Sequence, residues 1–260
     1  MKRKILALCA VALAVTACLN STESTPSDFG FIVMNAESTA EGYVVDPVAY
    51  FYRTTARIRL PDSEAARDTC IRQFGFPPEL EGFIAPTISA GSAFQLNVSG
   101  LETQMGIKVE DSFISYELSG GEPIEFTPGD SVSIVIPGEP GGFQPWTMKA
   151  KTAEAFTASP LPTYEVPTPI DLEWTPPEAA GSRMTLTLIY PVGNQGAEHV
   201  YCELVDDGEA TLSMGLVDAW RVAPPSSKQT IFVRQRFTGV ADNGAAVLVA
   251  STLEYRPTEP

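Results

Sequence analysis

The stretch TIFVRQRFTGVADNGAAVLVASTLEY, Thr230–Tyr255, decides the fold class of this chain. Two runs rich in Val, Phe, Thr and Leu flank the triplet Asp242-Asn243-Gly244. Because Asn and Gly both tolerate positive φ, an Asn-Gly pair between two such runs favours a tight β-hairpin. The stretch therefore predicts two antiparallel strands, Thr230–Val240 and Ala245–Tyr255.

Apolar and polar side chains also alternate through the rest of the second half, as they do in half-buried strands. Three further runs show this pattern: Ile170–Trp174, Arg183–Tyr190 and Val200–Leu204. The last run leads into Asp206-Asp207-Gly208, whose short polar side chains and glycine indicate a turn. The second half is thus predicted to consist of short antiparallel strands.

About six such strands in some ninety residues resemble the immunoglobulin-like and fibronectin type III sandwiches in architecture. The Cys-Trp-Cys spacing of true immunoglobulin domains is absent from the sequence, so the resemblance is one of architecture and not of family. Period-two alternation places Trp174 on the buried face with Ile170 and Leu172, while Asp171 and Glu173 face water. Trp174 is therefore predicted to anchor the core.

The first half is also rich in β-strand patterns, but they are less regular. One segment, Ser63–Phe74, lacks alternation and is predicted to be a short helix with Ser63 as its N-cap. Glycine- and proline-rich turns separate the predicted strands. These strands are Gly30–Asn35, Tyr43–Arg53, Ala56–Leu60, Ala93–Ser99, Phe113–Leu118, Ser131–Ile136 and Trp146–Thr152.

Residues 158–169 contain four prolines, which fix φ and remove backbone donors, and this composition predicts an extended linker. The predicted fold is all-β: two antiparallel β-sandwich domains, the second immunoglobulin-like, with at most one short helix in the first. The predicted divisions are a signal peptide (1–17), a tether (18–28), a first domain (29–157), the linker (158–169) and a second domain (170–260).

The N-terminus has the order of an export signal: Met1-Lys2-Arg3-Lys4, an apolar run from Ile5 to Val15, then Thr16-Ala17-Cys18. The apolar run is about half the roughly twenty residues that a membrane-spanning helix needs. Val15-Thr16-Ala17-Cys18 resembles the lipobox of bacterial lipoproteins. That resemblance implies cleavage before Cys18, a diacylated Cys18 thiol and a membrane anchor made of acyl chains.

The ordinary secretory alternative treats Cys18 as incidental. In bacteria that sort lipoproteins by the residue after the cysteine, Leu19 implies export to the outer membrane.

The charge of the chain argues against a nucleic-acid partner. The formal net charge is −15, and removal of residues 1–17 takes away three basic and no acidic residues, which leaves −18. After Lys4, the densest basic group is Arg53, Arg57 and Arg59, and this is no basic stripe of the kind that binds polyanions. Dispersed acidity is instead typical of a soluble extracytoplasmic surface.

The two cysteines that follow Cys18 are Cys70 and Cys202, one in each half of the chain. If the signal is used, they lie in a compartment where disulfides persist. They form the one candidate intramolecular disulfide. The sequence does not place their Cα atoms within bridging distance, and Cys202 lies in an alternating strand where a small apolar side chain suffices. Two separate buried thiols are therefore the favoured prediction over a bridge.

The sequence yields no catalytic site. Gly129-Asp130-Ser131 resembles the start of the motif of GDSL-type esterases, but Ser131 opens an alternating strand. The Asp-x-x-His partner of that motif is also absent, because the one histidine, His199, has Gly196 three residues before it. His199 is predicted to be a solvated residue at a strand end rather than a general base.

One histidine and two separate cysteines do not suggest a zinc site. Asp206, Asp207 and Glu209 are the densest acidic group, but they lack calcium-loop spacing and are predicted to form a solvated turn. No metal and no cofactor are predicted.

Three adjacent aromatic residues, Tyr50, Phe51 and Tyr52, must point to alternate faces of their strand. One face is then aromatic, and it is either covered by other parts of the protein or serves as a binding surface for a protein or glycan partner. The leading hypothesis is a non-enzymatic, lipid-anchored envelope protein with a binding, adhesion or assembly role. The alternative hypothesis is an envelope hydrolase or carbohydrate-active enzyme with an unrecognised carboxylate pair.

Overall fold

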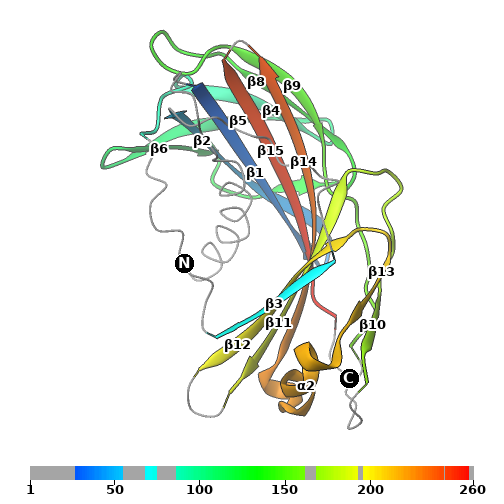
Figure 1. Cartoon of the computed structure of the whole chain (residues 1–260). Helices are drawn as coiled ribbons and strands as arrows, with labels where there is room; N and C mark the ends of the chain where they lie inside the picture. Colours follow the sequence, from blue (N-terminus) through cyan, green and yellow to red (C-terminus); the bar gives the residue numbers. More distant parts are fainter. Residues whose placement is uncertain are drawn as a thin grey trace. The chain divides into compact units, whose positions relative to one another are not determined.

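The longest hairpin of the protein joins strand β1 (Ser27–Thr39) to strand β2 (Gly42–Thr54) in this computed structural model (Figure 1). The register runs from Ser27 opposite Thr54 to Thr39 opposite Gly42, so a two-residue turn connects the strands. The Thr39 hydroxyl donates to the Gly42 carbonyl at 3.1 Å, and Gly42 has φ +140°. Glycine adopts such a φ without the clash that a Cβ would cause.

The structure describes residues 27–54, 68–74, 86–161, 168–192, 196–242 and 244–257. Contacts divide the chain into two compact units, each assembled from separate segments. Unit 1 comprises Met1–Asp62, Leu80–Ala153 and Arg236–Thr252, whereas unit 2 comprises Ser63–Glu79, Glu154–Gln235 and Leu253–Pro260. This division differs from the predicted one, in which each domain is a single stretch on one side of 158–169.

Unit 1 contains sheet strands in the order β15-β1-β2-β6-β5-β4-β8-β9, and the short strand β7 also pairs with β2. β1 and β15 run in the same direction, because the Asp28 amide donates to the Gly244 carbonyl at the start of both strands and Thr252 donates to Asn35 further along both. Strand β14 lies next to β15, as the Asn-Gly hairpin signal predicted. Both of these strands contribute residues to both units. The remaining strands are β4 (Ala93–Val98), β5 (Leu101–Glu110), β6 (Phe113–Leu118), β7 (Ile124–Phe126), β8 (Ser131–Ile136), β9 (Trp146–Lys151), β14 (Gln229–Asp242) and β15 (Ala245–Tyr255).

The core of unit 1 is a cluster of aromatic rings on one face of this sheet. Phe51 is fully buried, and its ring centroid lies 4.8 Å from that of Phe143, 5.4 Å from that of Tyr116 and 6.0 Å from that of Phe94. Such edge-on and tilted arrangements are the favoured ones for aromatic pairs. The Tyr116 hydroxyl accepts from the Ala90 amide and so pairs its one polar group inside the core.

Unit 2 has a sheet of order β3-β12-β11-β14 and a second sheet made of β10 and β13. Helix α2 begins directly after β13 and contacts β11 and β3 (Figure 1). Its buried residues Val217, Trp220 and Arg221 are spaced as one helical face requires. The elements are β3 (Thr69–Phe74), β10 (Ile170–Glu173), β11 (Ser182–Pro191), β12 (Ala197–Val205), β13 (Glu209–Leu212), α2 (Met214–Val222) and a 3₁₀ turn (Pro225–Ser227).

The predicted register of β10 is confirmed. Ile170, Leu172 and Trp174 are buried, whereas Asp171 and Glu173 are exposed. The Trp174 ring packs 6.3 Å from the ring of Phe232, which lies in β14. Trp174 is thus a core residue of unit 2, as the alternation predicted.

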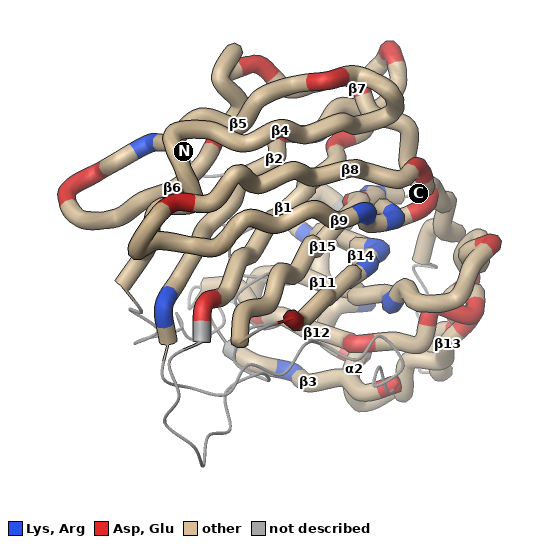
Figure 2. The backbone as a smooth tube through the Cα atoms, turned by 90° about the horizontal axis from the view of Figure 1, so that it is seen from above, with Lys and Arg blue, Asp and Glu red and all other residues tan. Residues whose placement is uncertain are grey.

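The all-β class is confirmed. Antiparallel pairing joins β1 to β2, β2 to β6 and β7, β5 to β4 and β6, β8 to β4 and β9, β12 to β3 and β11, and β10 to β13. A large sheet with a small second sheet is consistent with a sandwich fold. Within the described ranges, the helices are short, and none has the length and apolar character needed to cross a bilayer. Asp and Glu are spread over many turns and strand ends (Figure 2).

Several local predictions were wrong. Residues 69–74 of the predicted helix Ser63–Phe74 form strand β3, while 63–67 lie outside the described residues. Helix α2 lies in the second half, where no helix was predicted, and strands β5 and β7 were not predicted either. The predicted strand Ala56–Leu60 falls outside the described residues.

The first residues of the predicted linker are part of unit 2. Ala158 pairs with Trp174 in an antiparallel bridge, the Ser159 amide donates to the Glu173 carbonyl at 2.9 Å, and Leu161 is buried. Residues 158–161 therefore extend the β10 side of unit 2 instead of forming a solvated connector. Residues 162–167 lie outside the described part of the chain.

Candidate functional site

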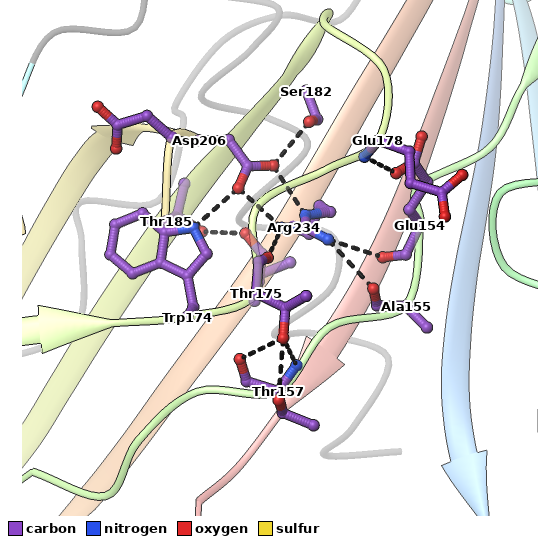
Figure 3. A network of polar contacts seen from close by, with 12 residues as sticks. Glu154, Ala155, Thr157, Trp174, Thr175, Glu178, Ser182, Thr185, Asp206 and Arg234 are labelled. Atoms are coloured by element: carbon purple, nitrogen blue, oxygen red, sulfur yellow. Dashed lines mark hydrogen bonds and ion pairs between the residues drawn. The ribbon is translucent and has the colours of Figure 1, made fainter. Parts of the chain in front are cut away.

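The carboxylate of Asp206, in the turn between β12 and β13, accepts four hydrogen bonds from side chains of unit 2 (Figure 3). Arg234 of β14 binds it with two nitrogens, Nε to Oδ2 at 2.7 Å and Nη2 to Oδ1 at 2.9 Å. Trp174 donates its indole N–H to Oδ1 at 2.9 Å, and the Ser182 hydroxyl donates to Oδ2 at 2.6 Å. Each carboxylate oxygen thus has two donors.

The guanidinium of Arg234 also uses all of its hydrogen-bond donors. Its Nη1 donates to the carbonyls of Glu154 and Ala155 at 3.4 and 3.2 Å, and Nη2 also donates to the Thr175 carbonyl. With the two bonds to Asp206, these account for the five N–H donors of an arginine. The guanidinium carbon also lies 4.8 Å from the centre of the Phe156 ring, within the range of a cation–π contact.

This network is structural rather than catalytic. The side chains of Arg234 and Asp206 are 0% and 1% exposed, so no substrate reaches them without local opening. Burial of a charge is costly unless it is paired and hydrogen-bonded, and both conditions hold here. The pair fixes β14 to the β12–β13 turn and to residues 154–156, which are distant in sequence.

The prediction that Asp206, Asp207 and Glu209 together form a solvated turn was wrong for Asp206. The turn exists, with Gly208 at φ +104°, and Asp207 and Glu209 are exposed, but Asp206 points inward to Arg234. Asp206 is therefore paired with Arg234 and cannot join Asp207 and Glu209 as a calcium ligand. Among the residues that the structure describes, no group of three or more His, Cys, Asp or Glu could hold a metal ion.

His199 is buried in β12, so the prediction of a solvated strand-end histidine was wrong. Burial lowers the pKa of its imidazole, because desolvation disfavours the charged form. Gly129 and Asp130 form a turn that leads into β8 at Ser131, as predicted. His199 and Ser131 belong to different units, β12 in unit 2 and β8 in unit 1.

Cys70 and Cys202 form a disulfide, so the favoured prediction of two separate thiols was wrong. The two residues face each other in the β3–β12 pairing, with their Cα atoms 4.0 Å apart. Both belong to unit 2, because β3 leaves the first half of the chain to join the sheet of the second. The bridge closes a separation of 132 residues in sequence.

Glu198, four residues before Cys202 in β12, is held by two partners. Arg72 of β3 donates to both its carboxylate oxygens at 2.6 and 2.8 Å, and the Tyr190 hydroxyl donates at 2.7 Å. Chiefly through the hydrogen bonds of Arg72, the pKa of Glu198 is lowered below its ordinary value. A general acid near neutral pH needs a raised pKa, so Glu198 is unsuited to that role.

The candidate binding site is a group of partly exposed aromatic side chains in unit 1. We call Tyr50, Tyr52 and Phe113 the aromatic strip. The rings of Tyr50 and Tyr52 stack with centroids 6.3 Å apart, and Tyr50 lies 5.5 Å from Phe113, which is 45% exposed. Phe51 points to the opposite face, as the alternation predicted, and is buried in the core.

Burial raises the pKa of both tyrosines of the strip, so their hydroxyls stay neutral at physiological pH. The strip adjoins a buried apolar face of β1, where Phe31 and Phe29 stand opposite Tyr50 and Tyr52. Phe113, the first residue of β6, is more exposed. Exposure within the strip therefore increases from the two half-buried tyrosines to Phe113.

The β5–β6 hairpin beside the strip presents further apolar side chains to solvent. Val109 is 60% exposed, and Ile107 on the same strand is also exposed. The register sets Val109 opposite Ile114 and Glu110 opposite Phe113, so Val109 and Phe113 lie on opposite faces of the hairpin. Strand β5 was not predicted, although Met105, Ile107 and Val109 alternate with Gly106, Lys108 and Glu110, which is a period-two signal.

No family model, no curated protein and no solved structure matches this chain. The immunoglobulin-like label for the second half therefore stays a prediction. Cys18, the residue predicted to carry the lipid, lies outside the described residues.

Proposed function

We propose that this chain is a lipid-anchored protein of the cell envelope that binds a protein or glycan partner through the aromatic strip and the β5–β6 hairpin of unit 1. One observation carries the binding part: Phe113 is 45% exposed and lies beside the half-buried Tyr50, which in turn stacks on the half-buried Tyr52. Apolar side chains concentrated at one place on a surface are typical of interaction sites.

The chemistry of the strip suits recognition more than catalysis. Tyrosine and phenylalanine supply large, rigid contact areas, and aromatic side chains are enriched where partners bind. The neutral tyrosine hydroxyls add hydrogen-bonding capacity at the edge of an apolar surface. With a mature net charge of −18, the protein is a poor match for nucleic acid, which supports a protein or glycan partner.

The anchor follows from the lipobox-like sequence before Cys18. Cys18→Ser removes the thiol that carries the diacylglyceryl group. We expect this variant to lose labelling by radioactive palmitate and to leave the membrane fraction or remain unprocessed. Normal membrane attachment of the unlabelled variant would contradict the anchor.

The binding surface is tested by site-specific photocrosslinking in intact cells. A benzophenone amino acid replaces Phe113 in one variant and Leu101 in the control, because Leu101 is also apolar and 50% exposed, on β5 of the same sheet. We expect a discrete adduct from position 113 and none from position 101. Tyr52→Ala in the position-113 variant is expected to weaken that adduct, since Tyr52 belongs to the strip.

Equal adducts from both positions, or no adduct from position 113, would contradict the assignment of this surface. Treatment of the adduct with protease and with glycan-degrading enzymes distinguishes a protein partner from a glycan.

A further inference from the structure

We propose that β3 is a releasable edge strand, held in the sheet of unit 2 by the Cys70–Cys202 disulfide and set free when that bridge is reduced. β3 belongs to unit 2, whereas the aromatic strip belongs to unit 1. β3 ends the strand order of this sheet and pairs there with β12. An edge strand is bonded along one side, so it detaches without disrupting the strands behind it.

Little apolar burial holds β3 in place. Thr69 and Arg72 are exposed, Cys70 and Gln73 are half-buried, and Ile71 is 55% exposed. Strands are normally retained because one of their faces is buried against a core. β3 lacks this contribution in the side chains that the structure describes, so its attachment depends on other contacts.

Those contacts are a backbone ladder, a few polar pairs and the disulfide. Arg72 donates to both oxygens of Glu198 and, at 3.2 Å, to Asp218 of α2. The Asp68 carboxylate accepts from the Val205 amide at 3.0 Å. These polar contacts lie at the surface, where solvent and salt weaken ion pairs. The covalent bridge is therefore the strongest single attachment of β3.

The Cys70 end of the bridge is the less buried one. Cys70 is half-buried, whereas Cys202 is fully buried. A thiolate of an external dithiol attacks Cys70 Sγ and displaces the Cys202 thiolate, which takes up a proton. The second thiol of the reductant then attacks the mixed disulfide, releases Cys70 as a thiol and closes the disulfide of the reductant. Two electrons and two protons pass to the protein.

Release has a structural consequence for β12. Its neighbour on the other side is β11, with a continuous register from Arg183 opposite Val205 to Pro191 opposite Ala197. The β11 side stays paired when β3 leaves. The β3 side of β12 then presents a row of unpaired N–H and C=O groups, which is the kind of edge that accepts another strand.

The test is hydrogen–deuterium exchange on the full mature protein, oxidised and after treatment with a dithiol reductant, with peptides resolved by mass spectrometry. We expect those amides of 69–74 that donate to β12 to exchange roughly 100-fold faster after reduction, a factor within the stabilisation that a disulfide commonly provides. Amides of β11 and β14 are expected to keep their protection. A Cys70→Ser, Cys202→Ser double variant is expected to match the reduced protein.

Two results would overturn the proposal. Unchanged protection of 69–74 after complete reduction would mean that β3 is held without the bridge. Loss of protection in β11 and β14 together with β3 would mean that reduction unfolds unit 2 as a whole and that β3 is no separate element. Arg72→Met in the oxidised protein serves as the matched control, since it removes the ion pairs of β3 and keeps the disulfide.

Discussion

Replacement of Arg234 by methionine is the sharpest test of how unit 2 is held together. Methionine keeps much of the length and apolar volume of arginine but removes the charge and all five N–H donors. The Asp206 carboxylate then remains buried with two neutral donors, Trp174 and Ser182. The carbonyls that Arg234 caps at residues 154, 155 and 175 lose that donor as well.

The expected cost is about 3 to 5 kcal/mol of unfolding free energy, the range found when one partner of a buried ion pair is removed. For a chain of this size, that corresponds to a fall in melting temperature of about 6 to 20 °C. Urea unfolding of the oxidised mature protein, followed by tryptophan fluorescence, measures the effect, because Trp174 lies within the network. Circular dichroism of the same samples shows whether the two probes change together.

Two further variants separate the ion pair from general damage. Arg234→Met combined with Asp206→Leu removes both charges and is expected to be more stable than Arg234→Met alone, because no uncompensated charge stays buried. Arg256→Met is the control: Arg256 also pairs with a carboxylate, that of Glu254, but both side chains are substantially exposed. Its expected cost is below about 1 kcal/mol. A cost of that size for Arg234→Met would refute the assigned role of the network.

Trp174→Ala is expected to cost about 3 to 5 kcal/mol in urea unfolding, against about 0.5 kcal/mol or less for Glu173→Ala on the exposed face; similar values for the two would contradict the register. Because the pKa of Glu198 is lowered in the folded protein, its stabilisation is complete above the unfolded pKa of about 4.3 and is lost as the pH falls through the folded pKa. Glu198→Gln should therefore reduce the loss of stability between neutral pH and about pH 3, and an unchanged pH profile would count against this. Cleavage at a protease site engineered in place of 162–167 should leave fragments that separate on gels after reduction but not before, since the disulfide joins the two sides.

The parts of the fold that were predicted correctly depend on local sequence patterns. The Asn-Gly hairpin of β14 and β15 and the buried face of β10 follow from neighbours within a few residues. The limits of β6, β8 and β15 agree with the predicted strands. Alternation also placed Phe51 on the face opposite Tyr50 and Tyr52, and the structure shows that Phe51 lies on the core side.

The wrong predictions concern segments whose structure depends on distant partners. The segment around Cys70 has a helix-like start and no alternation, yet pairing with β12, more than a hundred residues away, makes it a strand. Tertiary contacts routinely override such weak local propensities. The disulfide was not predicted for the same reason, because the sequence alone does not show that β3 and β12 are neighbours. Helix α2 was missed because its nine residues give only a short periodic signal.

Local alternation did not reveal the buried network. In β14, Thr230, Phe232 and Arg234 share one face, and the structure shows that all three are buried. A buried charged residue needs a partner of opposite charge, because its desolvation is otherwise too costly. The sequence did not indicate this burial, since Ile231, Val233 and Phe237 make the other face of β14 the more apolar one.

The pairing of Arg234 with Asp206 also bears on how unit 2 is assembled. Its segments Ser63–Glu79, Glu154–Gln235 and Leu253–Pro260 are separated in the chain, so adjacent hairpins alone cannot hold them together. A directional contact specifies which segments meet, whereas apolar burial by itself tolerates other arrangements. The Asp206–Arg234 pair and the disulfide are both contacts of this specific kind. The prediction that Arg234→Met is costly thus tests whether unit 2 depends on a few specific long-range contacts as well as on its apolar core.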